Sequence, residues 1–172
     1  MNQAFDTQLQ VSVRALREIV APALAGADKH VVEQLHLVMA ALEFMGQRIP
    51  AARRYYRDEL ASYIALSRDA VALVSAEAGT ECADLVEAMG TGESELQRPD
   101  AEIEHYQLIT RRLREGLAGL LALSTGHTAE AALQALILER SEAILLAARV
   151  WCLPLGFELN PEALPRLGWS AD

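Results

Sequence analysis

The stretch from residue 103 to residue 120, IEHYQLITRRLREGLAGL, decides the fold class. Its apolar residues return every three or four positions, at Ile103, Tyr106, Ile109, Leu113, Leu117 and Leu120. A period near 3.6 places them on one face of a helix, whereas a half-buried strand alternates every two residues. Gly116 and Gly119 cost a helix about 1 kcal/mol each relative to alanine. We therefore expect them to permit the close approach of a neighbouring helix.

The same spacing recurs on both sides of this stretch. It predicts further helices over about residues 5–24, 29–46, 50–78 and 128–151, with a short one over 80–89. Asp28 is the expected N-cap of the second of these helices, and Pro22 is expected to kink or end the first. Residues 90–94, GTGES, are rich in glycine and small polar residues, so they predict a loop.

The apolar residues are distributed differently on two of these helices. The helix after Asp28 carries one stripe that we expect to face inward, made of Val31, Leu35, Val38, Met39, Leu42 and Met45. The helix over 128–151 has apolar residues on most sides of its axis, such as Leu133, Leu138 and Ile144. Such a helix is either central in the fold or covered by a partner.

The composition agrees with a helical fold. There are 30 alanines and 27 leucines, against 10 valines and 7 isoleucines, and alanine and leucine are good helix formers. The sequence thus predicts an all-α, antiparallel helical bundle of five to six helices. We expect one domain over residues 1–172, with the bundle over 1–151 and an irregular, Pro-rich apolar tail over 152–172 that straps across the bundle or a second subunit.

Charge and cysteine content exclude several classes of partner. The net charge of −9 opposes binding to the phosphates of a nucleic acid. No signal peptide and no membrane-spanning stretch is visible, so we expect a cytoplasmic protein. Cys82 and Cys152 are 70 positions apart, match no zinc or redox spacing, and are interpreted as small buried hydrophobic residues.

A pair of Glu-x-x-His sequences raises the alternative of a metal centre. They are Glu33–His36 and Glu102–His105, and ferritin-like bundles bind two iron or manganese ions through two such motifs and two further glutamates. However, Glu33 lies about 160° from the centre of its helix's apolar stripe, so it is expected to face outward. We therefore expect no cofactor, and keep the ferritin-like di-metal bundle as the alternative.

Arginines provide the candidates for a binding site for an anionic small molecule. Arg53, Arg54 and Arg57 cluster near the start of a predicted helix, and arginine binds carboxylate and phosphate groups in bidentate fashion. Surface ion pairs are the competing interpretation of this cluster. Arg140 falls on the stripe of the most apolar helix, where it is expected to need a carboxylate partner, with Glu43 or Glu102 as candidates.

The first quarter of the chain resembles a small, uncharacterised bacterial helical family. The resemblance lies in the run LREIVAPAL at 16–24, followed by KHVV at 29–32 and a second apolar helix. Members of that family are similar to accessory proteins encoded beside enzymes that resemble aminoglycoside phosphotransferases and acyl-CoA dehydrogenases. The resemblance implies association with a partner enzyme and supplies no catalytic residues.

The sequence lacks the common catalytic signatures. It has no Gly-x-Gly-x-x-Gly motif, no P-loop lysine and no nucleophile elbow. The leading expectation is therefore a non-enzymatic helical protein that interacts with another protein or with itself, most simply as a homodimer.

Overall fold

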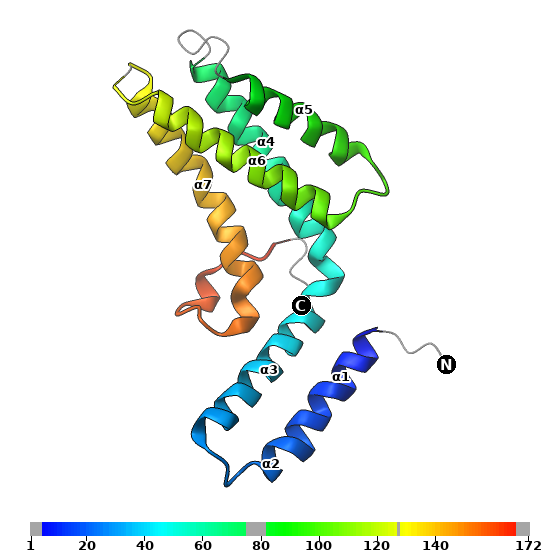
Figure 1. Cartoon of the computed structure of the whole chain (residues 1–172). Helices are drawn as coiled ribbons and strands as arrows, with labels where there is room; N and C mark the ends of the chain where they lie inside the picture. Colours follow the sequence, from blue (N-terminus) through cyan, green and yellow to red (C-terminus); the bar gives the residue numbers. More distant parts are fainter. Residues whose placement is uncertain (1–4, 75–81, 127, 168–172) are drawn as a thin grey trace. The chain divides into compact units, whose positions relative to one another are not determined.

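The protein is all-α, as the sequence predicts. The computed structural model describes residues 5–74, 82–126 and 128–167, and these residues form helices and turns but no strand. Figure 1 shows the long helices, which are α1 Phe5–Ala15, α3 Lys29–Arg48, α4 Ala52–Val74, α5 Ala83–Gln97, α6 Ile103–Leu123 and α7 Glu130–Cys152. No helix within these ranges is long and apolar enough to cross a membrane.

The contacts divide the chain into two compact units. One comprises residues 52–147 and is called the core unit below. The other comprises residues 1–51 and 148–172 and is called the hairpin unit.

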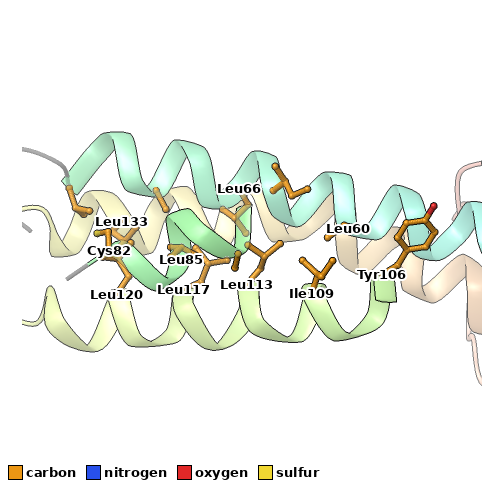
Figure 2. Packing of buried hydrophobic residues seen from close by; sticks show 14 of the residues in the cluster. Leu60, Leu66, Cys82, Leu85, Tyr106, Ile109, Leu113, Leu117, Leu120 and Leu133 are labelled. Carbon is orange, nitrogen blue, oxygen red and sulfur yellow. The ribbon is translucent and has the colours of Figure 1, made fainter. Parts of the chain in front are cut away.

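In the core unit, α4, α5 and α6 and the first part of α7 run alternately up and down around a shared apolar interior (Figure 2). The predicted inner face of α6 is confirmed, because Tyr106, Leu113 and Leu117 are buried there, and Leu60 of α4 is buried in the same interior. Leu133 of α7 is fully buried against the same interior.

The prediction of a loop at residues 90–94 is wrong, because α5 continues through them. Glycine has a local cost in a helix, but at Gly92 it permits contact between helices. A Cβ atom there would lie 2.8 Å from Cδ1 of Ile64 and 3.3 Å from Cγ2 of Ile109. The hydroxyls of Thr91 and Ser94 donate hydrogen bonds to carbonyls one turn earlier in the same helix, which satisfies the polar groups of this segment.

Of the two glycines of α6, one lies against a neighbouring helix and the other does not. A Cβ at Gly116 would lie 2.9 Å from Cδ1 of Leu85, so the predicted close approach of a neighbouring helix is confirmed there. At Gly119 nothing lies within 4 Å of the added carbon, so the prediction is wrong at that position.

The hairpin unit is built around two helices. α1 continues into a π-helical turn, Leu16–Val20, and a final short turn α2, Ala21–Ala23. Pro22 follows this wide turn. A proline ring clashes with the carbonyl four residues earlier, and the wider turn, in which the N–H of Ala21 donates to the carbonyl of Leu16, relieves that clash. Asp28 caps α3 as predicted, since its carboxylate accepts from the N–H of His30 at 2.8 Å.

The end of α7 and the segment after it complete the hairpin unit. This segment forms two short 3₁₀ turns, Leu153–Leu155 and Pro161–Ala163. Glu158 accepts two hydrogen bonds from the guanidinium of Arg149, at 2.8 and 2.9 Å. These bonds hold the segment against the last turn of α7 and lower the pKa of Glu158.

Candidate interaction surface

One side of α3 presents a continuous row of uncharged residues to solvent. The row has the heptad spacing of three and four residues and consists of Val31, Gln34, Val38, Ala41 and Met45, all exposed. Val31, Val38 and Met45 are 47%, 50% and 48% exposed. We call these five residues the α3 row. Apolar residues at this spacing are the pattern with which helices pack against other helices.

A second row of apolar residues on α3 packs against α1. It consists of Val32, Leu35, Met39 and Leu42, which are half-buried, and α1 packs against α3 with Leu9 half-buried and Val13 buried. The centres of the two rows lie about 100° apart around α3. Helix α1 therefore covers one apolar row and leaves the other exposed.

Apart from the buried Arg48, the charged residues of α3 lie away from the α3 row. At 100° per residue, Glu33 lies about 120° from the centre of the row, and Lys29 and Glu43 lie about 160° from it. Glu33 lies within ion-pair distance of Lys29, at 3.4 Å, and Glu43 accepts from Arg17 of the π-helical turn that follows α1. The row is consequently bordered by apolar and neutral side chains over most of its length.

The opposite side of the hairpin is different in character. There, an open groove of about 470 Å³ lies between α1 and α3. Its floor includes Leu9 and Leu42, while charged residues such as Asp6, Arg14 and Glu43 line it. Phe5, which is 79% exposed, lies on the other flank of α1, about 100° around the helix from Asp6. Phe5 therefore adds to the side of the hairpin that carries the α3 row.

The C-terminal end of α3 is fixed by a buried arginine. Arg48 donates from Nε to the carbonyl of Trp151 at 2.8 Å and from Nη2 to the carbonyl of Val150 at 2.9 Å. Its guanidinium also lies over the indole of Trp151, which in turn packs edge-on against Phe44. Burial lowers the pKa of Arg48. These contacts satisfy carbonyls in the last turn of α7 and fix the α3 helix that carries the row.

The arginines predicted as an anion site are engaged with the protein itself. Arg53 donates from Nε to the carbonyl of Ala101 at 3.3 Å and also donates to the carbonyl of Pro99. Arg54 and Arg57 are exposed and each lies 4.0 Å from Asp58. The three arginines therefore hold a loop and flank a carboxylate.

Arg140 differs from its prediction in both burial and partner. It is exposed rather than buried, and it pairs with Asp69 of α4 instead of Glu43 or Glu102. The long arginine side chain extends its charge from an apolar helix face to the solvent. The ion pair joins α7 to α4 at the surface of the core unit.

The two Glu-x-x-His sequences lie in different units. In the hairpin unit, Glu33 and His36 are exposed on α3. In the core unit, Glu102 is the exposed N-cap residue of α6, and Nδ1 of His105 lies 3.0 Å from Oε1 of Glu95. In the described part of the chain, no three histidine, cysteine or acidic residues lie together in a group that could hold a metal ion.

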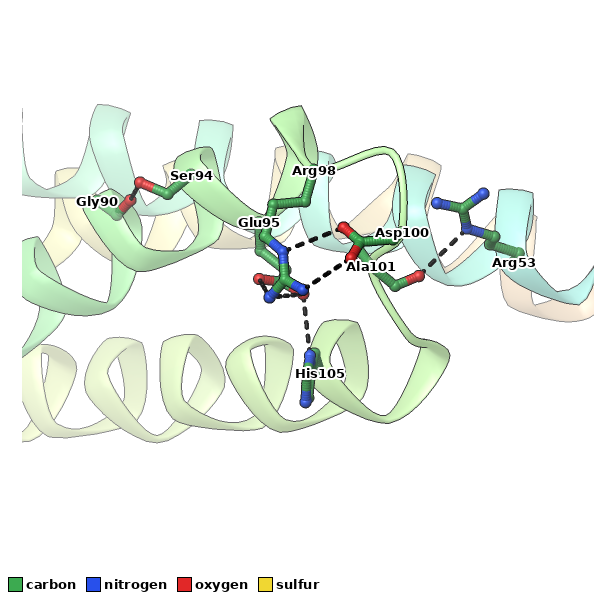
Figure 3. A network of polar contacts seen from close by, with 8 residues as sticks. All are labelled: Arg53, Gly90, Ser94, Glu95, Arg98, Asp100, Ala101 and His105. Atoms are coloured by element: carbon green, nitrogen blue, oxygen red, sulfur yellow. Dashed lines mark hydrogen bonds and ion pairs between the residues drawn. The ribbon is translucent and has the colours of Figure 1, made fainter.

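Figure 3 shows the polar network that surrounds His105. Glu95, at the end of α5, also receives a hydrogen bond from Arg98, and Arg98 reaches Asp100. The hydrogen bond from Arg98 lowers the pKa of Asp100. Together with the bonds from Arg53, the network fixes the turn between α5 and α6, which gives it a structural purpose.

No family model, curated protein or solved structure matches the chain. Sequence reasoning missed the α3 row because it assigned Val31, Val38 and Met45 to the same inward stripe as Leu35 and Leu42. The stripe itself carried no signal that separates the two rows, because its residues span about 120°, an ordinary width for one buried helix face.

Proposed function

We propose that this chain is a non-enzymatic protein-interaction protein, and that it binds its partner through the α3 row. The observation that carries the proposal is an exposed, heptad-spaced, uncharged row on a helix whose neighbouring row is already packed. Leaving about half of three large apolar side chains in water is unfavourable, at about 25 cal/mol for each Å² of apolar surface. Covering the row with another protein removes that cost.

The two units differ in how much of their apolar surface is buried, and this difference supports the proposed function. The core unit has its own buried interior, and its polar groups serve to join helices: Arg68 pairs with Glu93, and Arg112 pairs with Glu87. The hairpin unit has much less buried apolar surface, with Val13 the one buried residue in α1. A two-helix hairpin with an exposed apolar side is the arrangement that gains most from an added helix.

The experiment compares two substitutions that add the same charge on opposite sides of α3. Val38→Glu places a carboxylate in the middle of the row, and His36→Glu places one about 180° away from it. Native mass spectrometry of protein purified from the cells that express it should find a stoichiometric complex for the wild type and for His36→Glu. Val38→Glu should be found as the single 18.8-kDa chain.

Circular dichroism controls for folding, and we expect both variants to keep the wild-type helical signal because both positions are exposed. A wild-type chain that is found with no bound protein, neither a second copy nor a different chain, would refute the proposal. So would a complex that survives Val38→Glu unchanged.

A further inference from the structure

We infer that the partner that covers the α3 row is a second copy of this chain, packed antiparallel about a two-fold axis that passes beside Val38. This inference rests on the proposed function and specifies its partner. The two α1–α3 hairpins then form a four-helix arrangement in which each copy supplies two helices.

The first argument is the symmetry of the row. A two-fold interface requires one surface to be complementary to itself, so a residue and its counterpart must exchange places across the axis. Val31 lies seven positions before Val38, and Met45 lies seven positions after it. An antiparallel copy therefore places Val31 against Met45 of the partner subunit and Val38 beside its own counterpart. Gln34 and Ala41 fall at nearly equivalent positions between them.

The second argument is electrostatic. Each copy carries a net charge of −9, so two copies repel unless the charges avoid their contact. The carboxylates of Glu33 and Glu43 would come near each other in an antiparallel pair if they lay on the row. They lie about 120° and 160° away from it. The surface that meets its own copy is thus the neutral side of an acidic chain.

The exposed area on this side of the hairpin is also comparable with that of a small dimer interface. The exposed parts of Phe5, Val31, Val38 and Met45, with Leu37 about 80° around α3 from the centre of the row, amount to on the order of 500 Å². A standard interface buries about 800 Å² on each partner, and the exposed side chains of Gln34 and Ala41 add to the available area. The available surface therefore suits a modest dimer interface.

Cysteine cross-linking tests this arrangement directly. Cys82 is buried and Cys152 is exposed, so Cys82→Ala and Cys152→Ser give a background without native thiols. Val38→Cys in this background should form disulfide-linked dimers rapidly under mild oxidation. His36→Cys, on the opposite side of α3, is the matched control and should form at least tenfold less dimer.

Orientation is decided by mixing two single variants, Val31→Cys and Met45→Cys, that carry tags of different size. The antiparallel pair predicts a mixed Val31→Cys–Met45→Cys dimer and little of either homodimer. Residues 14 positions apart in a helix are separated by about 21 Å, so the parallel pair would instead give the two homodimers.

The outcomes separate this inference from the function on which it rests. Efficient homodimers of Val31→Cys would overturn the antiparallel arrangement, and equal cross-linking of His36→Cys and Val38→Cys would overturn the use of the row. A complex that needs the row but contains a different protein, such as an enzyme, would overturn the inference and leave the proposed interaction function standing. A chain that binds nothing would end both.

Discussion

Two glycines in one helix should respond in opposite directions to the same substitution. In α5, Gly90→Ala adds a carbon that meets nothing within 4 Å. Alanine is favoured over glycine in a helix by about 1 kcal/mol, so this variant should gain about that much stability. Gly92→Ala adds a carbon 2.8 Å from Ile64 and 3.3 Å from Ile109, and both neighbours are buried. Overpacking of this kind costs about 1–3 kcal/mol, so Gly92→Ala should be less stable than Gly90→Ala by roughly that amount.

Urea unfolding followed by circular dichroism measures both changes. The dependence of the unfolding free energy on urea concentration should stay constant while the midpoint moves, since neither variant alters the surface exposed on unfolding. Gly119→Ala and Gly116→Ala provide the same contrast in α6, with a gain expected at the former and a loss at the latter. If Gly92→Ala gained as much stability as Gly90→Ala, the helix packing described for the core unit would be wrong.

Three further results are expected. The hydroxyl of Ser67 is buried without a hydrogen-bond partner among the described residues. Ser67→Ala should therefore raise the unfolding free energy by about 1 kcal/mol in urea melts. A fall in the unfolding free energy would show that the hydroxyl has a partner. Arg48→Met should destabilise the hairpin unit by about 1.5–3 kcal/mol, because two carbonyls lose a charged donor. It should also shift the fluorescence emission of Trp151, and an unchanged emission spectrum would contradict the burial described. Arg149 lowers the pKa of Glu158, so that pair stabilises the fold above the unfolded pKa of the carboxyl and loses this effect as the pH falls below it. The protection of the amides of residues 153–164 against exchange, relative to their intrinsic rates at each pH, should therefore fall on acidification, and in Arg149→Ala it should be low at both pH values.

The helices of the core unit could be predicted because periodicity alone reports which face of a helix is buried. Leu60, Leu113 and Leu133 occupy the interior as their spacing indicates. The helical continuation through Gly92 could not be predicted in this way. Its local preference points to a loop, and only the contacts with Ile64 and Ile109 show why a residue without a side chain is suited to the helix.

Ion pairs between residues far apart in the sequence could not be predicted either, because they too depend on how the helices pack. Arg140 lies on an apolar face, and the sequence indicates that it needs a carboxylate. Which carboxylate is near depends on the order of the helices in space. In the structure it is Asp69 of the adjacent α4, and the long side chain keeps the charge in water.

The candidate site was predicted in part. The sequence predicts one apolar stripe on α3 that faces inward, but it cannot say which of two interleaved rows a neighbour covers. Packing of α1 against Leu35 and Leu42 settles this, and it leaves Val31, Val38 and Met45 exposed. The apolar row that remains exposed is the surface on which the proposed interaction rests.

The most direct test of the central claim is the accessibility of the α3 row as a function of protein concentration. In the background without native thiols, Val38→Cys should react with a maleimide at a rate that falls as the protein concentration rises, because association covers the row. His36→Cys should react at one constant rate. A rate at position 38 that stays constant and equal to that at position 36 over the whole range would contradict the account.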